Sequence, residues 1–230
     1  MAPHRDALLE ALTDLVSRPD AEIDLPSAAL VLARVEYPDL DIAHHRQALR
    51  VLARGAVGML PRRPAKTVEE VTRIVFDEMG FRGNREEYSD PRNSFLNDVL
   101  ERRVGIPISL SVVYIEIAEA CGRETDAIGF PGHFLVRDRE SGAVLDPFHR
   151  GAVVDEHACR RLLAANGIPL SQWKDDFLAA VGKLDILARM IANLVRAYGE
   201  RGRTDRVSML AALSARLEEL REAGDAAPLQ

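Results

Sequence analysis

The stretch that decides the fold is GIPISLSVVYIEIAEACG, residues 105–122, followed by the shorter segments GFPGHFLVRD (129–138) and LDPFHRG (145–151). In the first segment, a glycine and a proline interrupt the chain before an almost entirely apolar run, which predicts a buried helix. The two shorter segments contain runs of strand-forming residues separated by turn-like residues, which predicts a β-hairpin. The core is therefore expected to combine one buried helix with an antiparallel hairpin.

Helices are expected on both sides of this core. Between residues 5 and 57, apolar residues recur at spacings of three and four, which predicts three amphipathic helices. Thr67 and Glu70 form a capping box that opens a further helix, expected to end at Gly80. The apolar pattern of residues 183–224 predicts a pair of amphipathic helices. The predicted fold class is thus α+β.

The same pattern predicts three parts in the chain. Residues 1–80 form an N-terminal helical segment, residues 81–166 the core, and residues 167–230 a region that contains the C-terminal helical pair. A chain of 230 residues is long enough to bury a sizeable core without disulfide bonds.

Composition limits the classes of partner. With 30 basic and 36 acidic residues the net charge is −6, which argues against nucleic acid as a partner, and the basic cluster at 62–66 is expected to be a solvated linker. No run of eighteen apolar residues predicts a membrane span, and charges within the first apolar stretch argue against a signal peptide. We therefore expect neither a nucleic-acid nor a membrane partner.

The two cysteines, Cys121 and Cys159, match neither a disulfide framework nor a zinc motif. This predicts a reducing compartment and a cytoplasmic location. His157 lies two residues before Cys159, but a zinc site would need a third and a fourth ligand. We therefore expect no metal and no cofactor.

The predicted hairpin carries a histidine and an aspartate. His133 begins one strand and Asp146 ends the other. If the connecting loop has two or four residues, opposed positions sum to an odd number, as 133 and 146 do, so both side chains point to one face. A three-residue loop would separate them. On one face, Asp146 would bind one ring nitrogen of His133 and leave the other free to act as a base.

A buried helix before an antiparallel hairpin is the order of elements in a papain-type core. The nucleophile of such a core lies at the start of the helix, where exposed amides and the helix dipole favour an anion. Here the region 105–111 contains no cysteine, and its hydroxyl groups are those of Ser109 and Ser111. Serines near a helix start more commonly bond to backbone groups, so a catalytic and a structural role both remain open.

The segment 93–122, together with the Gly-His-Phe of 132–134 and the Asp-Pro-Phe of 146–148, resembles the SirB-type family of transglutaminase-like proteins. The resemblance covers most of the chain. It implies a transglutaminase-like core with tetratricopeptide-like C-terminal helices, in a family whose activity is poorly defined. The superfamily signature is a cysteine, a histidine and an aspartate; His133 and Asp146 match the last two, but the cysteine position falls near Pro107.

Three functional hypotheses follow from this pattern. The first is a non-catalytic protein that binds a peptide or protein in the former active-site groove, for which we expect the residues Gly105, Pro107, Pro131, Gly132 and Arg137. The second is a serine-dependent hydrolase or acyl transferase, with Ser109 or Ser111 as nucleophile, His133 as base and Asp146 orienting it. The third is a helical adaptor that acts through the C-terminal helices.

Arginines near the expected groove suggest one further property. Four of them could receive an acidic group if they converge on the groove, namely Arg102, Arg103, Arg137 and Arg150. As surface salt-bridge partners they would have no such role.

Overall fold

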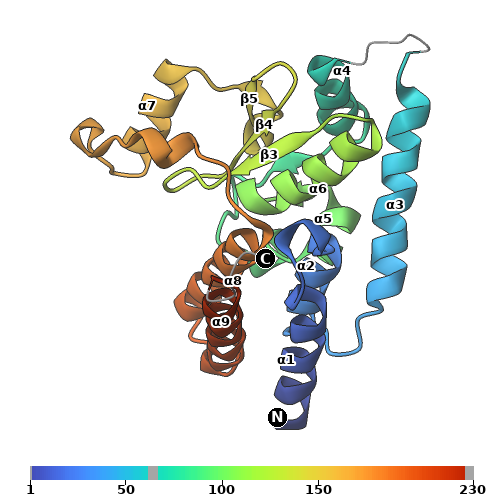
Figure 1. Ribbon diagram of the computed structural model, residues 1–230, viewed down its shortest axis with the longest axis vertical. Coiled ribbons are helices and arrows are strands. Elements are labelled where there is room, and N and C mark those ends of the chain that lie inside the picture. The colour runs from blue at the N-terminus through green and yellow to red at the C-terminus, as the bar shows by residue number, and fades with distance from the viewer. Residues whose placement is uncertain (1, 62–66, 226–230) are drawn as a thin grey trace.

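The α+β architecture is confirmed in a computed structural model, which describes residues 2–61 and 67–225. A four-stranded antiparallel sheet and a buried helix form the centre, and helices from both ends of the chain lie around them (Figure 1). The basic cluster at 62–66 lies outside the described residues. Within the described residues, no helix is both long and apolar enough to cross a bilayer.

The N-terminal region contains the helices α1 (Ala2–Val16), α2 (Leu25–Ala33) and α3 (Ile42–Met59), as the apolar spacing predicts. Helix α2 begins at a cap in which the Asp24 carboxylate accepts a hydrogen bond from the Ser27 amide. Its side chains are almost all buried because it packs against α1, α3, α5 (Leu96–Arg102) and α8 (Lys183–Glu200). The N-terminal helices therefore belong to the main hydrophobic core.

The predicted capping box is confirmed at the start of α4 (Val68–Arg73), where the Thr67 hydroxyl and the Glu70 carboxylate each bind the other residue's amide. The helix continues as a π-helical turn, Ile74–Glu78. The predicted stop is also confirmed, because Gly80 has a φ of +74°, which glycine adopts without strain.

Helix α6 (Pro107–Ala120) is the predicted buried helix, and ten of its fourteen residues are buried. It follows α5 (Leu96–Arg102) and the short strand β2 (Val104–Gly105), which pairs in parallel with β1 (Arg82–Gly83). Proline at the first helical position lacks an amide hydrogen that the helix would leave unpaired anyway. The helix therefore begins at Pro107, and neither serine is its N-cap.

The sheet has the strand order β3 (Thr125–Ile128), β4 (Leu135–Asp138), β5 (Val144–Asp146) and β6 (Ala152–Val153). Val136 lies opposite Leu145 and Arg137 opposite Val144, so opposed positions sum to an odd number. The odd sum expected for a loop of even length is thus confirmed, but His133 does not begin the strand, because β4 starts two residues later, at Leu135. Strand β6 was not predicted, because two exposed residues carry no periodic signal.

The remaining helices are α7 (Glu156–Ala165), α8 (Lys183–Glu200) and α9 (Thr204–Asp225). Helix α7 ends at the predicted Asn166–Gly167 stop and packs with the outer side of the sheet in a second, smaller apolar cluster. Helices α8 and α9 lie side by side, and α9 also packs against α1 (Figure 1). The C-terminal pair thereby brings α8 against α6 and the sheet region.

A buried ion pair fixes the start of the β4–β5 turn. Arg123, after α6, donates from Nε to the Asp138 carboxylate at 2.9 Å, and Asp138 is 0% exposed. Asp138 also accepts from the Ser141 amide at 2.8 Å, inside the turn. Burial alone would raise the pKa of Asp138, but these hydrogen bonds lower it below its usual value. The pair therefore links α6 to the hairpin.

We predict that Asp138→Ala lowers the free energy of unfolding by about 3 kcal/mol, because it leaves the Arg123 cation buried with Glu140 as its exposed partner. Urea denaturation followed by circular dichroism measures the loss. The control is Arg139→Ala, which removes an ion pair with Asp126 in which the arginine is 56% exposed; it should cost less than about 1 kcal/mol. Equal losses in the two variants would contradict a structural role for the buried pair.

Candidate functional site

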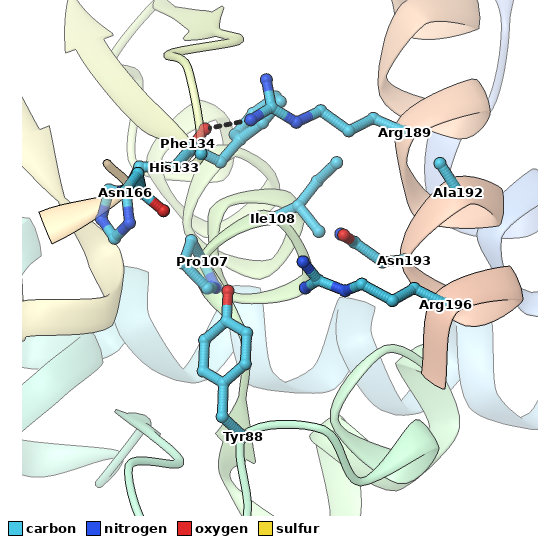
Figure 2. Close-up of a pocket in the computed structure, with 11 residues that line it drawn as sticks. Tyr88, Pro107, Ile108, His133, Phe134, Asn166, Arg189, Ala192, Asn193 and Arg196 are labelled. Atoms are coloured by element: carbon cyan, nitrogen blue, oxygen red, sulfur yellow. Dashed lines mark hydrogen bonds between the residues drawn. The ribbon is translucent and has the colours of Figure 1, made fainter. Parts of the chain in front are cut away.

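A cavity of about 430 Å³ opens where the start of α6, the loop before β4 and one face of α8 meet (Figure 2). Pro107 and Ile108 come from α6, and His133 and Phe134 come from the loop and the residue before β4. Tyr88 and Asn166 close two further sides, and Arg189, Asn193 and Arg196 come from α8. The cavity thus lies at the position expected for a papain-type active site.

His133 and Asp146 form the predicted pair. His133 Nε2 lies 2.8 Å from Asp146 Oδ2, and the two residues are 8% and 3% exposed. Asp146 also caps the 3-10 turn Pro147–His149, because its Oδ1 accepts from the amides of Phe148 (3.0 Å) and His149 (3.2 Å). The end of β5 and the following turn therefore place the carboxylate against the His133 ring.

His149 is a third member of this group, which the sequence analysis did not assign to the His133–Asp146 pair. Its Nδ1 lies 2.7 Å from the same Asp146 oxygen that His133 contacts. Its position three residues after Asp146, within one turn, was the available signal. Asp146 is therefore bound by two imidazoles and two backbone amides.

The ionisation of Asp146 follows from these contacts. Burial alone would raise the pKa of the carboxyl, but the hydrogen bonds and charges of His133 and His149 lower that pKa well below its usual range. His133 contacts Asp146 through Nε2, and its Nδ1 has no hydrogen-bond partner among residues 2–61 and 67–225.

The two histidines and the aspartate could also hold a divalent cation, since their three ligand atoms lie within 4.8 Å of one another. Two imidazoles and a carboxylate suit zinc or non-haem iron. Direct hydrogen bonds of 2.7 and 2.8 Å nevertheless account for the positions of all three groups. Each histidine contact to Asp146 therefore has the geometry of a direct hydrogen bond.

The hydroxyl groups of both candidate serine nucleophiles form hydrogen bonds with backbone carbonyls. Ser109 Oγ donates to the Asn93 carbonyl at 2.6 Å, and Ser111 Oγ donates to the Pro107 carbonyl at 2.8 Å. Both residues are 0% exposed, and neither lines the cavity. Gly105 fits beside Ser109, because a Cβ there would lie 2.7 Å from the serine oxygen. This geometry favours the structural role of the hydroxyls.

The expected groove is partly corrected. Pro107 and Gly132 line the cavity, whereas Gly105, Pro131 and Arg137 do not. Gly105 packs closely against Ser109. The Arg137 guanidinium donates to the Leu178 carbonyl at 2.6 Å. Gly132 has a φ of +69° and leaves no room for a Cβ beside Asn166, so the loop needs glycine there.

The four arginines expected near the groove do not converge on it, and none lines the cavity. Arg103 stacks over Phe81, and Arg150 pairs with Asp77. The cations of the cavity are instead Arg189 and Arg196 on α8. In the sequence, Arg189, Asn193 and Arg196 form a polar stripe along α8 at spacings of four and three residues. The sequence alone does not show which part of the protein this stripe faces.

Arg189 ties α8 to the loop that carries His133. Its Nη2 donates to the carbonyls of Phe130 (2.6 Å) and His133 (2.7 Å), the second bond being drawn in Figure 2. Burial lowers the pKa of the Arg189 guanidinium. Helix α8 therefore helps to position the histidine as well as to line the cavity.

Comparison with known proteins agrees with this arrangement. Residues 43–192 match the family model described as the transglutaminase-like superfamily, a range that includes His133, Asp146 and Arg189. A UPF0162 protein of Xylella fastidiosa (strain 9a5c) is 37% identical over 212 residues, covering 89% of this chain and 75% of the relative. A UPF0162 protein of Vibrio cholerae is 32% identical over 177 residues, covering 75% and 65%.

A more distant type of relative shares a shorter region. F-box only protein 21 of Homo sapiens is 37% identical over 86 residues, which is 36% of this chain and 14% of that protein. The family model covers more than half of the chain, and the Xylella relative is matched over most of both sequences. The chain therefore belongs to the transglutaminase-like superfamily.

Proposed function

We propose that this protein binds a peptide or an extended segment of another protein in the cavity without attacking it covalently. The observation that carries the proposal is the start of α6, where Pro107 occupies the first helical position and lines the cavity beside His133. Proline has no nucleophilic atom. The nearby hydroxyls of Ser109 and Ser111 are committed to backbone carbonyls.

The form of the cavity supports binding. A volume of about 430 Å³ lies within the range of pockets that accept small ligands, and it suits one or two side chains of a peptide. Its walls are held before any ligand arrives, because Asp146 fixes His133 and Arg189 fixes the loop before β4. A preformed site loses less conformational entropy on binding.

The two alternatives have less support. A serine-dependent hydrolase would need Ser109 or Ser111 to leave a fully buried position and to face His133. The adaptor hypothesis needs a free surface on the C-terminal helices, whereas the inner face of α8 is used by the core and the cavity. Three further points stay predictions: the SirB-type assignment, the tetratricopeptide-like character of α8 and α9, and the cytoplasmic location. Both cysteines are buried, and neither forms a disulfide.

Peptide binding can be tested by selection from a phage-displayed library of random heptapeptides. Peptides enriched on the wild-type protein should lose at least tenfold in affinity for Ala192→Trp, because an indole on this exposed α8 residue would fill the cavity. Fluorescence anisotropy of synthetic peptides measures the change. Ala211→Trp, at an exposed position of α9, is the matched control and should bind normally. Enriched peptides that bind Ala192→Trp as tightly as the wild-type protein would show that they bind outside the cavity.

Serine reactivity gives a second prediction. A fluorophosphonate probe should leave Ser109 and Ser111 unlabelled in the folded wild-type protein, because neither hydroxyl is accessible or close to a base. Intact-protein mass spectrometry provides the readout. Labelling of either serine that disappears in His133→Ala would overturn the proposal in favour of an acyl transferase.

A third prediction concerns a variant that introduces a thiol at the start of α6. In Pro107→Cys, the new sulfur lies at a helix start beside His133, so its pKa should fall below that of an exposed cysteine. Alkylation by iodoacetamide at pH 7 should be at least about tenfold faster than in the control Val51→Cys, whose site is 53% exposed. Adding His133→Ala should remove most of this advantage. Equal rates in all three variants would show that position 107 does not correspond to the nucleophile.

A further inference from the structure

We propose that the cavity recognises a carboxylate of an acidic peptide through Arg196, Tyr88 and the start of α6, with Arg189 providing positive potential at greater depth. This inference rests on the proposed function, since it specifies the ligand of the same site. It is carried by two cations, a helix N-terminus and a buried histidine that surround one cavity.

The two cavity arginines lack a carboxylate partner among the described residues, 2–61 and 67–225. Many other arginines of the protein pair with acids; Arg46 with Asp24 and Glu116 is a half-buried example. The chain has a net charge of −6, so acidic partners are abundant. Positive charge that stays unpaired inside a cavity is what an anionic ligand requires.

Burial makes the positive charge of Arg189 energetically costly. Arg189 donates to two carbonyls, which satisfy hydrogen bonds but do not neutralise the cation. Burial lowers the pKa of its guanidinium, which means that its surroundings disfavour the charged form. A carboxylate entering the cavity would offset this desolvation.

The start of α6 adds to the positive potential. The helix has fourteen residues, and its N-cap residue, Ile106, offers no side-chain acceptor to the first amides. A second feature points to a ligand independently of the helix. His133 is 8% exposed and lines the cavity, and its Nδ1 has no partner in the described part of the chain. A polar group of the peptide backbone could bind there.

Tyr88 supplies a neutral donor at the mouth of the cavity. Burial raises the pKa of its phenol, although the charges of Arg196 and Arg189 oppose this, so the hydroxyl keeps its proton at neutral pH. Figure 2 shows the Tyr88 hydroxyl and the Arg196 guanidinium both pointing to the region beside Pro107. A guanidinium fork and a phenol at the helix start match the planar acceptor geometry of a carboxylate.

Asp146 is the acid that would oppose such a ligand. Its carboxylate does not line the cavity and is bound by His133, His149 and the amides of Phe148 and His149. These hydrogen bonds partly offset its negative charge, although that charge still contributes to raising the pKa of Tyr88. The arginines and the helix start supply the positive potential near Pro107.

The spacing along α8 separates the two cations. Seven residues correspond to about 10.5 Å of helix rise, and Arg189 is half-buried while Arg196 is exposed. Arg196 therefore lies at the mouth and Arg189 in the interior. Arg196 can be replaced without disturbing the loop that Arg189 holds, so it is the residue to test.

The experiment uses the best peptide from the heptapeptide selection, synthesised with Glu or Asp residues intact or replaced by Gln or Asn, and with a free or an amidated C-terminus. We expect acidic residues to be enriched in the selection. Arg196→Gln should weaken binding of the acidic peptide by at least tenfold and leave binding of the amide-substituted peptide unchanged. Arg50→Gln, the same change at an exposed position of α3, should have no effect on either.

The outcomes separate this inference from the proposed function. Enriched peptides that are neutral or basic, or an equal loss for both peptide forms in Arg196→Gln, would overturn the carboxylate inference and leave peptide binding intact. No enrichment on the folded wild-type protein would overturn peptide binding itself. Loss of affinity on amidation alone would identify the C-terminal carboxylate as the recognised group, and loss on Gln or Asn substitution alone would identify a side chain.

Discussion

The buried carboxylate of Asp146 is the group on which the site depends. A carboxylate that is 3% exposed must have its charge and lone pairs satisfied, and here two imidazoles and two backbone amides do so. The amide contacts fix the turn after β5, and the contact with His133 fixes the ring that lines the cavity. The end of one strand, the next turn and the histidine before β4 are therefore held by one group.

Helix α8 complements this arrangement from outside the sheet. Arg189 binds the carbonyls of Phe130 and His133, so the loop that presents the histidine is held from two sides. The cavity consequently draws on residues from both the predicted core, 81–166, and the predicted C-terminal region, 167–230. The division of the chain into three parts stays a prediction, but the site joins the second part to the third.

The features predicted from sequence were those set by local rules. The capping box at Thr67 and Glu70 and the pairing of His133 with Asp146 follow from helix and strand periodicity, and both are confirmed. The cavity arginines could not be found in this way, because their role depends on how α8 packs more than fifty residues after His133. Arg137 was chosen for its nearness in sequence, yet strand alternation turns its side chain to Leu178.

Pro107 at the start of α6 affects the electrostatics of the cavity as well as its chemistry. In a papain-type centre, a thiolate at the helix start pairs with the histidine and uses the positive potential of the helix and its neighbours. Pro107 begins the helix equally well but brings no negative charge. The potential that would stabilise a thiolate is then left for another anion, and Arg196 at the mouth adds to it. A helix start without a negative charge, beside two arginines, is the physical basis of the proposal that the site binds acidic ligands.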